Sequence, residues 1–146
     1  MPLVSVTRLR IRSWRYLPAF AIDALRSSRQ AQRTPGFAGG WLGFAPGLAF
    51  WTVTVWRNEA SMRAYRDKEA HKTAMPKLLE WCDEASVARY EPLDGTIPDG
   101  EAAFAEMLAR GRTSKVRHPT PAHAAGDLVP DRKAPRIGQT LRATGS

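Results

Sequence analysis

One histidine, His71, combines a reactive side chain with a position on the apolar face of an expected helix. It shares one stripe with Met75, Leu78 and Cys82, at the spacing that places side chains on a single helix face. A neutral imidazole that faces a pocket can bind haem iron through one ring nitrogen, and it can also serve as a general acid or base. A packed histidine that hydrogen-bonds a neighbouring strand has the same pattern. His71 is therefore a candidate catalytic residue, or a metal ligand if haem binds, with structural packing as the alternative.

Three tryptophans, together with Met75, are candidates for lining a pocket. The chain has five tryptophans, a high number for 146 residues, and their large apolar rings suit a flat ligand such as a porphyrin or a polyene. The candidates are Trp41, Trp51 and Trp56, and glycines beside Trp41 leave room for a ligand or another backbone. The alternative is a place in the core or at a subunit interface, which we favour for at least two of the three.

A row of arginines stands near the N-terminus, where Arg8, Arg10 and Arg12 alternate with Leu9 and Ile11. This period of two predicts a strand with the arginines on one face. Such a row can bind haem propionates or an acidic substrate. The alternative, which we favour, is a solvated row on an edge strand, where charges block unwanted strand pairing.

Composition and charge exclude several classes of protein. The chain is long enough for one domain with a core. Its net charge is +8, and residues 112–146 supply seven basic and two acidic side chains, or +5 of that total. No patch of mixed basic and aromatic residues is present, so we expect no nucleic acid partner. The single cysteine, Cys82, excludes an internal disulfide and fits a reducing cytoplasm. Without a leader-like segment or an apolar run of about 18 residues, we expect a cytoplasmic protein with no membrane span.

Hydrophobic periodicity predicts alternating strands and helices along the first 111 residues. The expected strands are residues 3–12, 37–44, 48–56 and 86–90, and the expected helices are 15–33, 59–67, the run around 71–82, and 101–110. Ser13 and Asn58 are the expected N-caps of the first two helices. Bulky side chains occupy both faces of the strand at 48–56, so we expect both faces to be covered.

The element order strand-helix-strand-strand-helix-strand is the split βαβ, or ferredoxin-like, arrangement. We therefore expect an α+β domain over residues 1–111 that ends in a C-terminal helix, followed by a basic tail over residues 112–146. An antiparallel sheet with helices on one face leaves its other face bare, at a cost of about 25 cal/mol per Å2 of apolar surface. Two such sheets can pack face to face, so we expect a homodimer that forms a dimeric α/β barrel.

The run TVTVWRNEASMRAYRDKEAHKTAM resembles the dimeric α/β-barrel superfamily, in which a strand ending in tryptophan precedes an acidic helix start and an A-H-x-x-A segment. Within that superfamily the sequence is most similar to spheroidene monooxygenase-like proteins. The similar segments are TRLRIRSW, FWTVTVW, EAHKTAM and WCDEASVARYE. The resemblance covers residues 3–91 and leaves the segment from residue 112 unexplained.

This resemblance implies an oxygenase that acts on an apolar small molecule, with haem as a cofactor held through His71. The wider superfamily also implies an alternative, a cofactor-free monooxygenase of the antibiotic-biosynthesis type. A second alternative is a non-catalytic dimer that binds a small molecule. Because a shared fold does not specify a reaction, all three functions remain open at this point.

Overall fold

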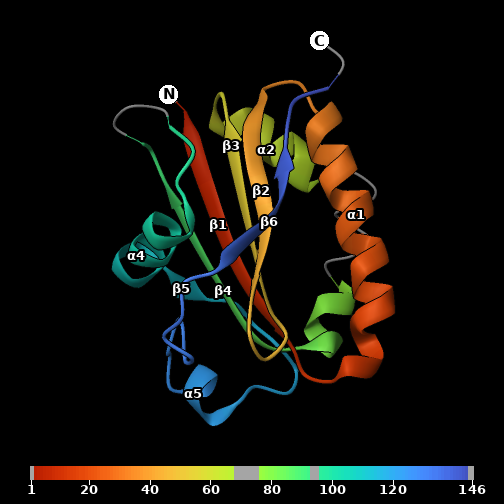
Figure 1. Cartoon of the computed structure of the whole chain (residues 1–146), viewed down its shortest axis with the longest axis vertical. Coiled ribbons are helices and arrows are strands. Elements are labelled where there is room, and N and C mark those ends of the chain that lie inside the picture. Colours follow the sequence, from red (N-terminus) through yellow and green to blue (C-terminus); the bar gives the residue numbers. More distant parts are fainter. Residues whose placement is uncertain (1, 68–75, 93–95, 145–146) are drawn as a thin grey trace.

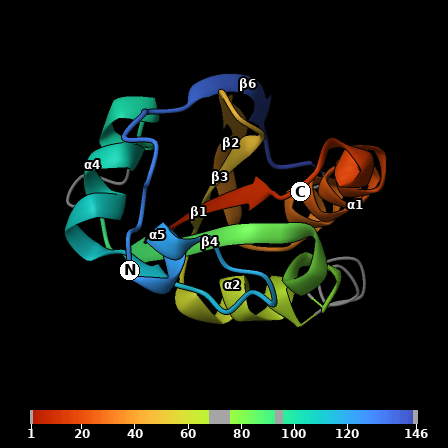
Figure 2. The same cartoon turned by 90° about the horizontal axis from the view of Figure 1, so that it is seen from below.

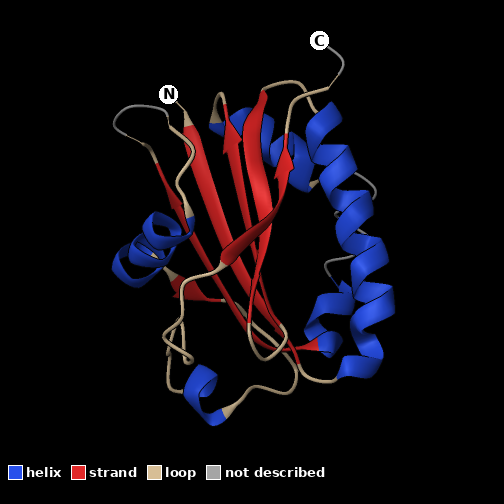
Figure 3. Ribbon diagram, in the orientation of Figure 1, coloured by secondary structure: helices blue, strands red, loops and turns tan. Residues whose placement is uncertain are grey.

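The structure of the chain, a computed structural model, describes residues 2–67, 76–92 and 96–144. Its strands form one sheet with helices on both sides (Figure 1, Figure 3). The strands are β1 (Leu3–Ile11), β2 (Phe37–Ala45), β3 (Ala49–Trp56), β4 (Cys82–Tyr90), β5 (Arg112–Thr113) and β6 (Arg136–Leu141). The helices are α1 (Leu17–Arg33), α2 (Glu59–Arg66), α4 (Gly100–Arg110) and α5 (Pro121–Ala124), with a short 3-10 turn, η1 (Trp14–Tyr16), before α1.

The sheet has the strand order β5-β4-β1-β3-β2-β6, and every neighbouring pair is antiparallel. Its four inner strands follow the order β4-β1-β3-β2, the arrangement of a ferredoxin-like fold. The α+β ferredoxin-like fold predicted from the sequence is therefore confirmed. Two strands from the C-terminal part of the chain, β5 and β6, extend the sheet at its two edges.

Local capping signals start α2 at the predicted residue and start a 3-10 turn before α1. The Ser13 side chain accepts a hydrogen bond from the Arg15 amide at the start of η1, and Asn58 accepts one from the Ser61 amide at the start of α2. Each cap satisfies an amide that has no partner inside its own helix. The first helix begins at Leu17, two positions after the predicted start, because η1 occupies the turn that follows Ser13.

Strand β4 begins at Cys82, earlier than the strand predicted from residue 86. The sequence predicted that the preceding helical run extends to residue 82. In the structure Asp83 forms an ion pair with Arg10 and Glu84 forms one with Arg8, both on β1. The paired residues are 73 and 76 positions apart in sequence, so local patterns could not indicate the pairing. Cys82 therefore lies in a strand and not on a helix stripe.

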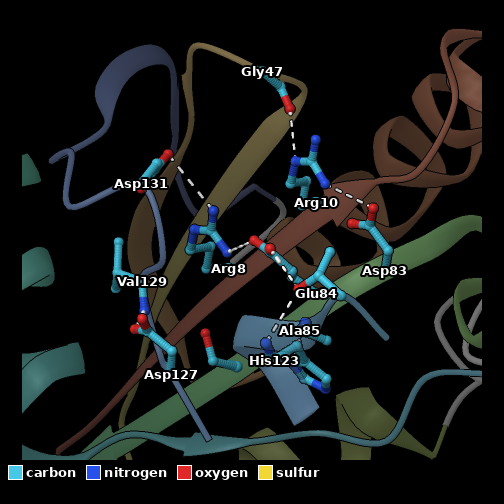
Figure 4. A network of polar contacts seen from close by, with 12 residues as sticks. Arg8, Arg10, Gly47, Asp83, Glu84, Ala85, His123, Asp127, Val129 and Asp131 are labelled. Carbon is cyan, nitrogen blue, oxygen red and sulfur yellow. Dashed lines mark hydrogen bonds and ion pairs between the residues drawn. The ribbon is translucent and has the colours of Figure 1, made fainter. Parts of the chain in front are cut away.

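The predicted edge position of β1 is wrong, because β1 lies between β3 and β4. Its arginine row is also not solvated in the way we favoured. The Arg8 side chain is 1% exposed, and its Nη1 lies 2.9 Å from Glu84 Oε1. Arg10 and Arg12 are each 2.7 Å from a carboxylate oxygen. Figure 4 shows the ion pairs of Arg8 and Arg10. These ion pairs neutralise the row, which leaves little charge for haem propionates or an acidic substrate.

One face of the sheet, which we call the sealed face, carries Val4 and Val6 of β1 opposite Val55 and Val53 of β3. Helix α4 and the segment before β6 cover it, whereas α1 lies on the opposite side of the sheet (Figure 2). The covering side chains are Ala103, Phe104, Met107, Leu128 and Val129. The sealed face is thus buried within a single chain.

This cover removes the physical reason for the predicted homodimer. A second protomer was expected to bury the bare sheet face, but Val4, Val6 and Trp51 are already at most 1% exposed in one chain. The segment from residue 112, expected to be a tail, contributes β5, β6 and part of the cover. The chain therefore covers both faces of its own sheet. The bulky third strand predicted cover on both faces, but the expected cover was a second protomer and not the C-terminal segment.

A polar network holds the C-terminal segment against the sheet (Figure 4). The Thr120 hydroxyl donates to Glu84 Oε2 at 2.9 Å, and Asp131 Oδ2 lies 3.6 Å from Arg8 Nη2. The buried ring of His123 contacts backbone groups through both of its nitrogens. Because Arg8 and Glu84 lie on neighbouring strands, the network ties β1 and β4 to the segment that follows β5.

Glycines in β2 allow close approach of neighbouring backbones. A Cβ at Gly40 would collide with the carbonyl oxygen of Val53 in β3, and a Cβ at Gly43 would collide with that of Arg136 in β6. The sequence left open whether these glycines make room for a ligand or for another backbone. At these two positions it is the backbone of a neighbouring strand that takes the space.

Candidate functional site

A cavity of about 330 Å3 lies between helices α1 and α2 and the second face of the sheet, which we call the cavity face. On β1 this face carries Ser5, Thr7 and Leu9, which alternate with the residues of the sealed face. The volume is at the lower end of the range for small-molecule sites. The lining residues are Ser5, Thr7, Leu9, Phe20, Asp23, Ala24, Ser27, Ser28, Ala31, Leu42, Thr52, Thr54, Trp56, Met62, Tyr65, Arg66, Leu78, Leu79, Ala85, Val87, Arg89, Arg112, Ser114, Lys115, Val116 and Leu141.

Four hydroxyl groups form the floor of the cavity. Ser5 lies opposite Thr54, and Thr7 lies opposite Thr52, in the antiparallel register of β1 with β3. Directly opposed residues point to the same side of a sheet, so the four hydroxyls form a compact group. Thr54 Oγ1 accepts a hydrogen bond from Trp56 Nε1 at 2.9 Å. Hydroxyl groups both donate and accept, so this floor can bind a carbonyl or a phenol.

An aromatic wall stands beside this floor. The Trp56 ring stacks on Tyr65 with 5.1 Å between ring centroids, and Phe37 meets the indole edge-on at 5.2 Å. Burial raises the pKa of Tyr65 above its ordinary value, and a hydrogen bond with the Ser27 side chain opposes that rise only in part. The Tyr65 hydroxyl therefore stays neutral at physiological pH. Because Trp56 is 0% exposed, the wall presents the uncharged ring of Tyr65 to the cavity, with Trp56 behind it.

Hydrocarbon side chains line another part of the cavity. Leu9, Phe20, Leu78 and Val116 contribute to the lining. Phe20 also packs against Phe50 with 4.9 Å between ring centroids. This part favours an apolar group, because each Å2 of apolar surface removed from water contributes about 25 cal/mol.

Charged side chains reach the cavity from both layers. Asp23 of α1 is the one carboxylate among the described lining residues, and Lys77 Nζ lies 3.3 Å from its Oδ2. Three arginines also line the cavity: Arg66 from the end of α2, Arg89 from β4 and Arg112 from β5. Positive groups thus outnumber negative ones around the described lining.

Only one of the three candidate tryptophans lines the cavity. Trp56 does so, whereas Trp41 and Trp51 belong to the core of the sealed face. Alternate residues of a strand point to opposite faces, which separates Trp51 from Trp56 within β3. Trp41 Nε1 donates to the carbonyl of Pro98 at 2.8 Å, between β2 and the loop before α4. Trp56 is also 0% exposed and belongs to a separate buried cluster, so all three tryptophans are core residues.

His71 and Met75 lie outside the described residues, so their roles as ligand, catalytic residue or pocket lining stay predictions. The helical residues from 76 onward are described, and Leu78 and Leu79 line the cavity. The other two histidines of the chain, His118 and His123, are absent from the described lining.

Cys82 is fully buried in β4. Burial, and to a smaller degree the charge of Asp83, raises the pKa of its thiol to about 12. Because the thiolate is the reactive form, this cysteine is not a nucleophile near neutral pH. Its environment agrees with the core role that the sequence suggested.

Sequence analysis did not single out the hydroxyl floor or the cavity arginines. A signal for the floor was present, since Ser5 and Thr7 alternate with valines in the first strand, as Thr52 and Thr54 do in the third. Hydroxyls at a period of two within a covered strand indicate a polar patch on one face. Arg112 gave no such signal, because its place depends on the pairing of β5 with β4.

The described lining residues are a poor match for haem. Haem iron in proteins is held by histidine, cysteine, tyrosine, or methionine together with histidine. Neither histidine nor cysteine is among the described lining residues, which do include Met62 and Tyr65. The raised pKa of Tyr65 opposes the phenolate that would bind iron. We therefore derive no step through haem. In the described part of the chain, no group of three or more His, Cys, Asp and Glu side chains could hold a metal ion.

The fold is shared with solved structures of low sequence identity. SnoaB from Streptomyces nogalater, described as a cofactor-independent oxygenase and solved as a mutant, is 14% identical, with a TM-score of 0.55 over 63% of this chain and 93% of its own. A putative antibiotic biosynthesis monooxygenase from Nitrosomonas europaea is 15% identical, with a TM-score of 0.57 over 63% and 90%. Rv0793 from Mycobacterium tuberculosis is 16% identical, with a TM-score of 0.59 over 64% and 97%.

These similarities show the ferredoxin-like fold that was predicted from the sequence. They do not support the narrower resemblance to spheroidene monooxygenase-like proteins. No family model matches the sequence, and no curated protein matches it significantly. More than a third of this chain lies outside each structural match. Among the described helices, none has both the length and the apolar character needed to cross a membrane.

Proposed function

We propose that this protein is a cofactor-free monooxygenase that oxidises a flat, largely apolar small molecule in the cavity. The observation that carries the proposal is the cavity itself. It lies between the helices and the cavity face of the sheet, and it combines a hydroxyl floor, an aromatic wall and an apolar part. One neighbour of the same fold is described as a cofactor-independent oxygenase, which favours this alternative over the haem-dependent one.

The chemistry requires a substrate that reacts with dioxygen itself. A methylene group between two aromatic rings that are themselves conjugated with a carbonyl is acidic, and its conjugate base is an electron-rich enolate. The enolate gives electrons to dioxygen, and the overall change converts the methylene group and one dioxygen molecule to a carbonyl group and one water molecule. One oxygen atom enters the product and the other leaves in the water, which carries both methylene hydrogens, so no external reductant is needed.

The described residues supply the protein's part of this reaction. Asp23 accepts the proton in our proposal, since it is the one carboxylate of the described lining and its side chain is 12% exposed. The hydroxyls of Thr52 and Thr54 bind the developing enolate oxygen, because donors placed where charge develops lower the barrier. The ring of Tyr65, backed by the fully buried Trp56, orients the ring system and excludes water.

The test is oxidation of anthrone, a tricyclic ketone with an acidic methylene, followed with an oxygen electrode. We expect uptake of one dioxygen per anthrone, at least about tenfold faster than the spontaneous reaction, with one atom of labelled dioxygen in the anthraquinone. A rate equal to the spontaneous one, with anthrone bound, would contradict catalysis. A Soret band after titration with hemin, together with a hemin-dependent rate, would favour the haem-dependent alternative.

A non-catalytic binding protein is the second candidate. It is favoured by one observation, that Asp23 is engaged with Lys77 and has no second acid or base beside it among the described lining residues. Such a protein would bind the same flat molecules and leave them unchanged. Mass spectrometry of anthrone recovered after incubation, compared with a protein-free sample, separates this candidate from the monooxygenase.

A further inference from the structure

Two arginines at one side of the cavity carry positive charge that the described chain does not neutralise. Arg89 and Arg112 both line the cavity. Among the described residues, neither makes a hydrogen bond or an ion pair through its side chain. Unpaired guanidinium groups beside a cavity are a means of recognising an anion.

The register of the strands places the two arginines together. Arg112 of β5 lies opposite Val87 of β4, so Arg112 and Val87 share the cavity face. Arg89 follows Val87 by two positions and therefore points to the same side. Diagonal neighbours in a sheet are about 7–8 Å apart, which lets two long side chains reach one common group.

The arginines of the sealed face behave differently. Arg8 and Arg10 are each within 2.9 Å of a carboxylate oxygen from β4. The fold thus neutralises the cations that it does not expose to a ligand. Arg89 and Arg112 have no such partner in the described part of the chain, although β4 itself carries Asp83 and Glu84.

Burial and neighbouring positive charges both affect the pKa of Arg89. Partial burial, followed by the charges of Arg112, Arg66 and Arg63, lowers its pKa from the ordinary value. Glu59 opposes this effect, but its carboxylate is already 2.8 Å from Arg63. An anion bound between Arg89 and Arg112 would relieve the repulsion.

We propose that the ligand of this cavity carries an anionic group, such as a carboxylate or sulfonate, on a flat apolar ring system, and that Arg89 and Arg112 bind that group. The rings then lie against Tyr65 and the hydroxyl floor of the same cavity. This inference rests on the proposed function only for the location of the site. It narrows the substrate class from an apolar molecule to an amphipathic anion.

The test uses two fluorescent probes that differ in one group. 8-Anilino-1-naphthalenesulfonate carries a sulfonate, and N-phenyl-1-naphthylamine has the same rings without it. For the wild-type protein we expect the anionic probe to bind about tenfold tighter or more. We also expect added salt to weaken that probe alone, because salt screens exposed charges.

The double variant Arg89→Gln/Arg112→Gln should lose about tenfold or more in affinity for the anionic probe and keep its affinity for the neutral one. The control, Arg29→Gln, removes an exposed arginine of α1 that does not line the cavity, and should change neither affinity. Equal losses in the control and the double variant, or no loss in either, would overturn the proposal.

A third variant locates both probes. Ala24→Phe places a ring in the cavity and should abolish binding of both probes in a protein with unchanged circular dichroism. Retained binding of the anionic probe would place it elsewhere and overturn the proposal. These titrations involve no reaction with oxygen. Tighter binding of the anionic probe than of the neutral one, in a protein that does not oxidise anthrone, would therefore support the anion site and contradict the monooxygenase. Anthrone oxidation without discrimination between the two probes would support the monooxygenase and contradict the anion site.

Discussion

The two faces of one sheet are built from the same strands and serve opposite purposes. On the sealed face, Val4 and Val6 of β1 are 0% exposed and pack with α4 and the C-terminal segment. On the cavity face, Ser5 and Thr7 of the same strand line an open space under α1 and α2. The difference shows that one strand can hold the fold together and also shape a ligand site, because successive residues point to opposite sides.

The charged side chains also differ between the sealed face and the cavity face. The sealed face contains a buried arginine, Arg8, whose charge is matched by Glu84. The cavity face contains two arginines, Arg89 and Arg112, with no carboxylate partner among the described residues. Paired charge supports stability and unpaired charge is available for binding. Substitutions on the two faces should therefore have different consequences, and the following experiments compare them.

The largest effect is expected from Glu84→Gln on the sealed face. The substitution leaves the charge of Arg8 buried, with Asp131 at 3.6 Å as its remaining acidic partner. Breaking a buried ion pair from one side costs about 3–5 kcal/mol, and we expect a loss of that size in urea unfolding. The double change Arg8→Met/Glu84→Met should recover much of it, because it removes both charges. A loss below about 1 kcal/mol, the range of exposed pairs, would show that this pair is not part of the stability of the sealed face.

The next effect concerns catalysis on the cavity face. Asp23→Asn should lower the rate of anthrone oxidation by about 100-fold or more, because it removes the proposed proton acceptor. The control is Asp131→Asn, an acid at the sealed face, which should leave the rate per folded molecule unchanged. Oxygen uptake measures both variants. Similar rates for Asp23→Asn and wild type would remove Asp23 from the mechanism.

A smaller effect separates two adjacent residues of β3. Val53→Thr buries a hydroxyl in the sealed face, where Val53 is 0% exposed, and should cost about 1–3 kcal/mol in stability. Thr52→Val makes the reverse change on the cavity floor and should change stability by less than about 0.5 kcal/mol, while it weakens anthrone binding. Urea unfolding and a binding titration compare the two. Equal losses of stability would mean that the two faces are not packed differently.

The last prediction is that the oligomeric state does not change with protein concentration. Because α4 and the C-terminal segment already cover the sealed face, we expect a monomer whose sedimentation coefficient stays constant across the micromolar range. Analytical ultracentrifugation measures this directly. A stable dimer would show that a surface other than the sealed face joins two chains, and would restore the homodimer predicted from the sequence on a different basis.

Much of the fold could be predicted from local patterns. The alternation in residues 48–56 predicted a strand covered on both faces, and the predicted cap Asn58 is confirmed at the start of α2. Ser13 caps the 3-10 turn before α1 and not α1 itself. The candidate site was harder to predict from the sequence. The pattern that places Trp56 on one face and Trp51 on the other is visible in the sequence, but it does not say which face holds a cavity.

Long-range pairing explains most of what sequence analysis missed. The arginine row of β1 depends on acids more than 60 positions away, and Arg112 reaches the cavity only through the pairing of β5 with β4. The segment from residue 112 has little periodicity, so nothing local indicated that it joins the sheet. Such contacts form between segments far apart in sequence, so neither composition nor local patterns predict them.

The sequence by itself determined the order of the elements and which residues share a face, because hydrogen bonding and side-chain alternation along a strand or helix are local. Only the tertiary structure decided which face would be filled and which would stay hollow. That choice depends on where α4 and the last 30 or so residues pack, and on the ion pairs that hold them there. The same alternating strands could have served either purpose until those distant segments covered one side.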